Sequence, residues 1–396
     1  MSILGAAHIC DDVNQTFLPA LLPFLVAHRG LSYTAAAGLV LAASISSSVV
    51  QPVIGHLSDR RSSPWLIAAG VFLAGGGLAL VGFMPTYSLI VLAVVVSGIG
   101  VATFHPEAAR FANFVAGAHK ASGMRWFTVG GNVGFAIGPL FAAAAIAAFG
   151  LRGTLLAAVP TTLAAVLVAA EVPRLLTFVP ARRTRTERDG VDRWSAFARL
   201  TAFVVVRSMA YVGIVTFTPL YFVGILHATP AQGSIALGLA LACGAIGNLV
   251  GGPLADRFGR RALLRWSTAL GIPLLLGFVW STAALHSVLL GDAFMMAAAF
   301  WIVMAQTAFV VLGQEYLPHH VGTASGVTLG LAISLGGAAS PALGALADHA
   351  GLVATMLAIV GLLALALAFS WTLPRDRRAA TGVDAVPRAA PVAAAG

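Results

Sequence analysis

Ionisable side chains stand inside apolar stretches of this sequence, where they could carry protons or bind charged molecules. Near the start, His8, Asp12 and Gln15 are spaced i, i+4 and i+7, so a helix would present all three on one face. Asp11 would point about 100° away from Asp12. The polar stripe predicts a water-filled cavity in which Asp12 binds and releases a proton. The alternative is that Asp11 or Asp12 merely reaches water at the nearby chain end.

A second ionisable group lies around a proline. The segment reads Phe104-His105-Pro106-Glu107 and is followed by Arg110. Pro106 removes a helical hydrogen bond and predicts a kink. His105 and Glu107 are candidates to carry a proton, because histidine titrates near neutrality and a glutamate in apolar surroundings holds its proton tightly. The alternative is a latch, in which Glu107 and Arg110 hold the loop at Asp59-Arg60-Arg61.

Arg207 is the basic residue that we place nearest the middle of a membrane span. Counting about 1.5 Å per residue from a helix start near residue 197 puts it roughly 15 Å deep. Its planar, permanently charged group suits a phosphonate or carboxylate, so Arg207 is a candidate substrate anchor, with His8, Gln15 and Asn132 as further candidates. The alternative is a structural ion pair with an acid of the first half.

Composition places most of the chain in a membrane. Hydrophobic residues make up 59% and charged residues 9% of the 396 residues, whereas a soluble domain carries about 25% charge. A bilayer-crossing helix needs about 20 apolar residues, and strands with open edges are excluded in hydrocarbon. The sequence predicts an all-α protein with twelve crossings, at 5–27, 33–56, 65–84, 88–114, 121–149, 153–172, 197–223, 231–255, 263–284, 288–316, 322–348 and 352–373.

The arginines and lysines predict the orientation. They gather in alternate loops, whereas the opposite loops hold only Arg29 and Arg152. By the positive-inside rule, both termini lie in the cytoplasm of a cell whose plasma (inner) membrane holds the protein. The net charge of +9 is then a signal of topology and of contact with anionic lipid, so we expect no nucleic-acid partner.

Repeated motifs predict a duplicated architecture. Ala121-Ser122-Gly123 returns as Ala324-Ser325-Gly326, 203 residues later, and Pro139 is matched by Pro341, 202 residues later. We therefore expect two pseudo-symmetric six-helix halves at 1–172 and 197–374, a basic linker at 173–196 and a disordered tail at 375–396. Gly130, Gly134 and Gly138 recur every four residues, which favours close approach of another helix.

These motifs resemble the major facilitator superfamily. Its loop signature stands here as Gly55-His56-Leu57-Ser58-Asp59-Arg60-Arg61 and again as Gly252-Pro253-Leu254-Ala255-Asp256-Arg257, and its antiporter signature as Gly138-Pro139. Asp59, Arg60, Asp256 and Arg257, with Arg110, are the expected gate residues, because the repeated loops lie at equivalent cytoplasmic helix ends.

A narrower resemblance links the chain to the fosmidomycin-resistance branch of that superfamily. The matching residues are His8-Ile9-Cys10-Asp11-Asp12, Phe104-His105-Pro106-Glu107 with Arg110, and Gly130-Gly131-Asn132. That branch has Asn-Asp where this chain has Asp11-Asp12, so the charge of the first helix differs. The resemblance implies proton-driven export of a phosphonate antibiotic and other drugs.

Three hypotheses of function remain open from the sequence. The leading one is a proton-coupled exporter of small drug-like or anionic molecules, working as a monomer; the second is a proton-coupled uptake symporter for an anionic metabolite. The third, a membrane enzyme or sensor, would need a catalytic constellation or a signalling domain. Phosphate-binding Gly-Lys-Ser loops, His-Glu-x-x-His pairs and nucleophile elbows are absent from the sequence, so we expect no enzyme activity, cofactor or metal.

Overall fold

The computed structural model describes residues 1–60, 63–117, 120–179 and 190–374, without the side chains of 58–60, 120–122, 329 and 333. Within these ranges every regular element is a helix. The first bundle consists of α1 (Ser2–Arg29), α2 (Tyr33–Arg60), α3 (Trp65–Leu80), η1 (Val81–Phe83), α4 (Tyr87–Ala116), α5 (Lys120–Phe149), η3 (Gly150–Ala157) and α6 (Ala158–Leu176).

The second bundle contains more interruptions than the first. Its elements are α7 (Trp194–Leu226), α8 (Pro230–Phe258), α9 (Arg260–Ala283), α10 (Val288–Met304), α11 (Gln306–Tyr316), η4 (Pro318–His320), α12 (Val321–Ser325), η5 (Gly326–Leu331), α13 (Ala332–Ala338) and α14 (Ser340–Trp371). Ala305 separates α10 from α11, and η5 is a π-helical turn. Gly351, with φ 85°, divides α14 into two helices.

The helix lengths agree with the predicted crossings. Nine stretches of the described chain are long and apolar enough to span a membrane, and two of them, of 54 and 38 residues, hold two crossings each. With the 28-residue α1 the described helices account for twelve crossings. The run lengths follow from the thickness of the hydrocarbon layer that each helix must cover.

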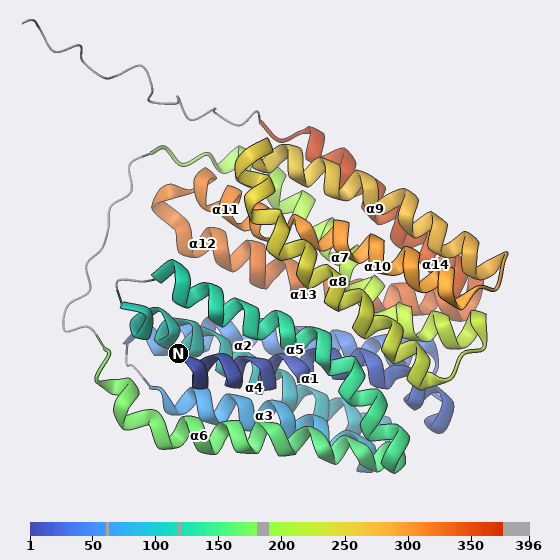
Figure 1. Ribbon diagram of the computed structural model, residues 1–396, viewed down its shortest axis with the longest axis horizontal. Coiled ribbons are helices and arrows are strands. Elements are labelled where there is room, and N and C mark those ends of the chain that lie inside the picture. The colour runs from blue at the N-terminus through green and yellow to red at the C-terminus, as the bar shows by residue number, and fades with distance from the viewer. Residues whose placement is uncertain (61–62, 118–119, 180–189, 375–396) are drawn as a thin grey trace, which may run out of the picture.

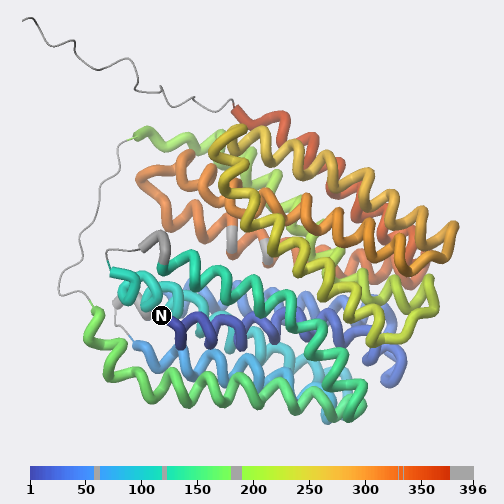
Figure 2. The backbone as a smooth tube through the Cα atoms, in the orientation of Figure 1, coloured from blue at the N-terminus to red at the C-terminus, as the bar shows by residue number. Residues whose placement is uncertain are grey.

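The helices form two bundles that lie side by side. Figure 1 shows α1–α6 in one bundle and α7–α14 in the other, and the tube in Figure 2 follows the same division. Helices α6 and α7 each extend a few residues into the linker predicted at 173–196. The middle of that linker and the tail at 375–396 lie outside the described residues, and the proposed boundaries of the halves stay predictions.

The apolar core is shared at one end of the molecule and divided at the other. One large cluster joins the later part of α1, around Phe17–Leu25, to the later part of α7, around Ala210–Phe222. Near the N-terminus each bundle has a core of its own, built around Phe104 in the first and Phe203 in the second. The bundles are therefore packed together at the end far from the N-terminus.

Glycines bring α1 and α5 into backbone contact. A Cβ atom at Gly130 would lie 2.7 Å from the carbonyl oxygen of Gly5, and one at Gly134 would lie 2.5 Å from that of Ile9. At Gly138 it would meet the Thr16 hydroxyl at 2.1 Å. The spacing of four residues thus serves close helix packing, as the sequence predicts.

Candidate functional site

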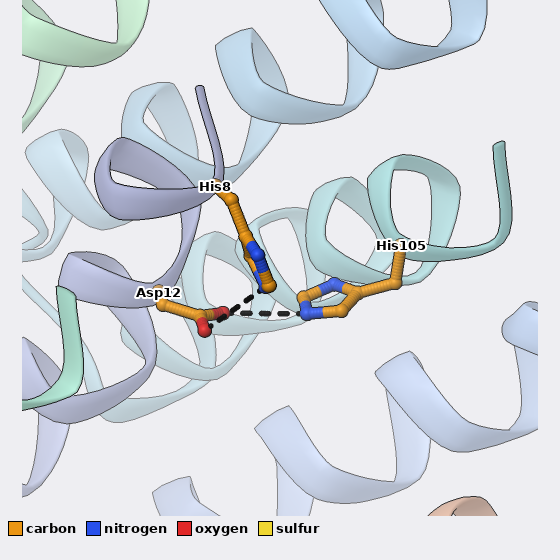
Figure 3. A group of neighbouring side chains, drawn as sticks. All are labelled: His8, Asp12 and His105. Carbon is orange, nitrogen blue, oxygen red and sulfur yellow. Dashed lines mark ion pairs between the residues drawn. The ribbon is translucent and has the colours of Figure 1, made fainter. Parts of the chain in front are cut away.

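Three side chains from two helices meet beside the α1–α5 contact. His8 and Asp12 lie one turn apart on α1, and His105 reaches them from α4 (Figure 3). His8 Nε2 lies 3.2 Å from Asp12 Oδ2, and His105 Nε2 lies 3.3 Å from Asp12 Oδ1. One carboxylate therefore stands between two imidazoles, with only 5% of the Asp12 side chain exposed.

The hydrogen bonds of His8 require a proton between His8 and Asp12. Nδ1 of His8 lies 2.8 Å from the carbonyl oxygen of Phe127. A carbonyl only accepts, so Nδ1 carries a hydrogen and donates it. Nε2 then faces Asp12, and two lone pairs would repel each other unless one proton lies between them. Stacking on the Phe127 ring, with centroids 4.1 Å apart, fixes the plane of the imidazole.

His105 repeats this arrangement from the other side. Its Nδ1 lies 3.0 Å from the carbonyl oxygen of Val101 and 3.3 Å from Asp11 Oδ2. The carbonyl oxygen only accepts, so Nδ1 carries the ring hydrogen, and Nε2 again faces Asp12 and requires a proton between them. Loss of that proton would remove the attraction that joins α4 to α1.

Asp11 belongs to the same group, although it points away from Asp12. It is fully buried, and its oxygens accept no hydrogen bond from the described residues, so the ring of His105 is its polar neighbour. Gly131 of α5 makes room for the group, because a Cβ there would lie 2.5 Å from Asp12 Oδ2. The sequence predicts the shared face of His8 and Asp12, and the structure adds Asp11 and His105 to it.

Gln15 connects this group to a cleft. Its Nε2 donates to Asp12 Oδ1, and Gln15 also lines a cleft of about 570 Å³, part of it open to solvent, between α1, α2 and α4. The polar lining consists of Asn14, Gln15, Ser44, Ser47 and Ser97. Asn14 was not predicted as a site residue, although an amide beside Gln15 on an apolar helix is a usable signal.

Glu107 lies apart from the Asp12 group and holds a loop. Its Oε1 accepts a hydrogen bond of 2.7 Å from the backbone N–H of Ser63, between α2 and α3, and one of 3.3 Å from Arg110. Glu107 is fully buried. Glu107 thus holds the loop at Ser63, while the predicted latch partners Asp59, Arg60 and Arg61 have side chains outside the described part of the chain.

Arg207 is buried inside the second bundle. Its guanidinium donates to the carbonyl oxygen of Ile302 and to Gln306 Oε1, and it lies over the ring of Phe309, 5.1 Å from the centroid. These partners flank the break at Ala305, where helix ends leave carbonyls without helical partners. No described carboxylate lies within ion-pair distance of Arg207. Tyr211 lies one turn along α7 from Arg207. It is within range of electrostatic interaction with both Arg207 and Asp12.

The other predicted site residues lie apart from this group. Asp256 is mostly exposed and lies 3.9 Å from Arg260, which pairs with Glu315 of α11. Arg257 covers the ring of Phe258. Both carboxylate contacts of Arg260 stay within the second bundle. Asn132, half-buried on α5, has an amide nitrogen without a hydrogen-bond partner in the described chain.

The His8, Asp12 and His105 side chains also have the spacing of a metal site. Their ligand atoms all lie within 4.8 Å of one another. Two imidazoles and a carboxylate suit a divalent transition metal. A proton and a metal ion would therefore compete for the same position between these side chains. Sensitivity of transport to a chelator distinguishes the two cases.

Comparison with known proteins gives one family. The model of the Major Facilitator Superfamily matches residues 4–341. An uncharacterised MFS-type transporter of Bacillus subtilis (strain 168), YfnC, is 30% identical over 95% of this chain and 93% of its own length. The fosmidomycin resistance protein of Escherichia coli (strain K12) is 28% identical over 92% of each chain.

Solved structures share the fold at lower identity. A bacterial homologue of the human lysosomal transporter Spinster, inward-facing and occupied, has a TM-score of 0.78 at 16% identity, covering 94% of this chain and 95% of that one. A mutant of the nucleoside transporter NupG has a TM-score of 0.75 at 12% identity, covering 94% and 99%. These similarities concern the arrangement of the helices.

Proposed function

The chain belongs to the Major Facilitator Superfamily and is a multi-pass membrane transporter of small molecules, and we propose that it exports drug-like or anionic compounds, of the phosphonate type, in exchange for protons. Export proceeds in this proposal by alternating access between the two six-helix halves. The fosmidomycin resistance relative supports this substrate class.

The observation that carries the proposal is the position of Asp12 between two imidazoles. Each Nδ1 donates to a carbonyl oxygen, so each contact with Asp12 depends on a proton. His8 is on α1 and His105 on α4, so gain or loss of a proton changes the force between two helices. A buried ionisable group of this kind in a membrane is by default a functional candidate.

Arg207 supports an anionic substrate. Arg207 has no carboxylate partner among the described residues, and a buried guanidinium so placed is costly in a membrane. Its carbonyl and ring contacts compensate the charge only in part. A phosphonate entering beside Tyr211 would supply the missing negative charge. The planar donors of arginine match the oxygens of such a group.

Packing at the two ends supports alternation. The halves share a core at the end far from the N-terminus and have separate cores at the end near it. The sequence predicts both termini on the cytoplasmic side of the inner membrane. The end with separate cores then faces the cytoplasm, so the molecule is open on that side. The loops at Asp59–Arg60 and Asp256–Arg257 are then gates at the open end, and Glu107 with Arg110 steadies the first of them.

Everted membrane vesicles give the test. With an acidic interior they should accumulate fosmidomycin, and a protonophore should abolish the accumulation. Asp12→Asn should prevent accumulation yet retain exchange of labelled for unlabelled fosmidomycin without a gradient. The control is Asp292→Asn, at a half-buried acid near the start of α10 in the second bundle, and it should behave as wild type. Release in place of accumulation would indicate the symport alternative. Loss of transport on adding EDTA would assign the Asp12 group to a metal, and full accumulation by Asp12→Asn would refute the proton assignment.

A further inference from the structure

The carboxamide of Gln15 faces two sites at once. Its nitrogen donates to Asp12 Oδ1, and the residue is half-buried in the wall of the cleft between α1, α2 and α4. Its oxygen accepts no hydrogen bond from the described residues, although an amide oxygen can accept two. The amide oxygen of Gln15 is therefore the acceptor available to a molecule in the cleft.

Asn14 offers a second unused acceptor in the same wall. Its Nδ2 donates to the carbonyl oxygen of Cys10 at 2.7 Å, while its Oδ1 is buried without a partner. The residue is 2% exposed, and it lines the cleft. An unsatisfied buried acceptor is unfavourable, and rotation about the terminal bond of an asparagine is soft, so Oδ1 can turn to meet a donor in the cleft.

We propose that this cleft binds a hydrogen-bond-donating group of the transported molecule, such as a hydroxyl or N–H, on the Gln15 oxygen, with Asn14 as the second acceptor. The proposal rests on the function proposed above, because the group bound in the cleft is part of the transported molecule. Ser44, Ser47 and Ser97 complete a polar lining that accommodates such a group.

The contact with Asp12 fixes which end of the Gln15 amide is free. Asp12 Oδ1 accepts from the amide nitrogen, so turning the amide over would lose this hydrogen bond. The amide oxygen therefore stays available to a donor in the cleft.

Two phosphonates that differ by one donor test this subsite. The probes are 3-hydroxypropylphosphonate and its O-methyl ether, titrated calorimetrically into the full-length protein in lipid nanodiscs. The wild type should bind the hydroxyl compound roughly 3- to 10-fold more tightly, as expected for one net hydrogen bond. Gln15→Met should lose this preference while keeping its affinity for the ether within about 3-fold, and Asn14→Leu should lose part of the preference.

Gln314→Met is the matched control, because Gln314 donates to Ser325 away from the cleft, and it should keep the preference. Equal binding of both probes by the wild type, or a preference that survives in Gln15→Met, overturns the subsite alone. If neither probe binds, the proposed anion transport fails and the subsite falls with it.

Discussion

Asp348 of the second bundle caps the first helical turn of α2 at Thr34 in the first bundle. Its Oδ2 accepts from the backbone N–H of Thr34 at 2.9 Å and from its hydroxyl at 2.6 Å, and its Oδ1 accepts from the N–H of Tyr33 at 2.8 Å. A carboxylate at a helix N-terminus is favourably placed for the helix dipole. This contact ties the bundles together at the end where their core is shared.

Asp348→Asn should open that end. The amide keeps one acceptor and loses the charge, so the closed state should lose about 1–3 kcal/mol, which shifts the ratio of states roughly 5- to 150-fold. Spin labels at His28→Cys and His286→Cys, in a Cys10→Ala/Cys243→Ala background, would report the distance across this end. An unchanged distance distribution would mean that the capping contact does not hold the bundles.

Gly131→Ala should damage the Asp12 group. The new methyl would lie 2.5 Å from Asp12 Oδ2 and 2.7 Å from His8 Cε1, so α1 or α5 must shift at a cost of about 1–3 kcal/mol. The unfolding temperature in detergent and the rate of gradient-driven transport should both fall. Gly76→Ala is the control, since nothing lies within 4 Å of its added Cβ, and it should leave stability equal or slightly higher. Equal behaviour of the two variants would contradict the packing argument.

Glu107→Gln should retain proton-driven transport. The glutamine oxygen can still accept from the N–H of Ser63, so the loop between α2 and α3 stays held although the charge is lost. Glu107→Leu removes the acceptor and should cost about 1–3 kcal/mol of stability and slow transport. Vesicle transport and thermal unfolding measure both effects. If Glu107→Gln uncoupled transport, Glu107 would carry the proton and the latch would be secondary.

Arg207→Lys should separate anionic from cationic ligands. Lysine keeps the charge but loses the planar donors that bind Ile302 and Gln306, so phosphonate binding should weaken about 10-fold or more while binding of a cationic dye stays unchanged. Fluorescence and calorimetric titrations of the purified protein give both affinities. An equal loss of affinity for the two ligands would mean that Arg207 stabilises the helix break at Ala305 and does not bind substrate.

The contact of Asp192 with η4 should loosen in acid. Slight desolvation raises the pKa of Asp192, but hydrogen bonds from the His319 backbone and the His320 ring outweigh it and hold that pKa below its ordinary value. A lowered pKa means that the contact contributes fully above about pH 4 and is lost as pH falls further. The protection of the amides at 317–320, measured against their intrinsic exchange rates, should therefore fall below that pH. Asp192→Asn should show the lower protection already at neutral pH.

The sequence predicts the helices better than it predicts their contacts. The lengths of apolar runs are set by bilayer thickness, so the crossings can be counted in advance. The i, i+4, i+7 spacing likewise places His8, Asp12 and Gln15 on one face. The contact of His105 with this group depends on how α4 packs against α1. The hydrogen bond between Glu107 and Ser63 depends on the path of a loop. Neither arrangement produces a periodic pattern in the sequence, so neither could be predicted from it.

The glycine contact between α1 and α5 bears on which helix would move in the proposed proton exchange. Backbone approaches backbone at Gly130 and Gly134, so little side-chain volume separates the two helices. His8 and Asp12 therefore lie on a closely packed pair of helices. In α4, Pro106 removes one backbone hydrogen bond directly after His105. Under the proposed exchange, α4 is therefore the helix that we expect to flex.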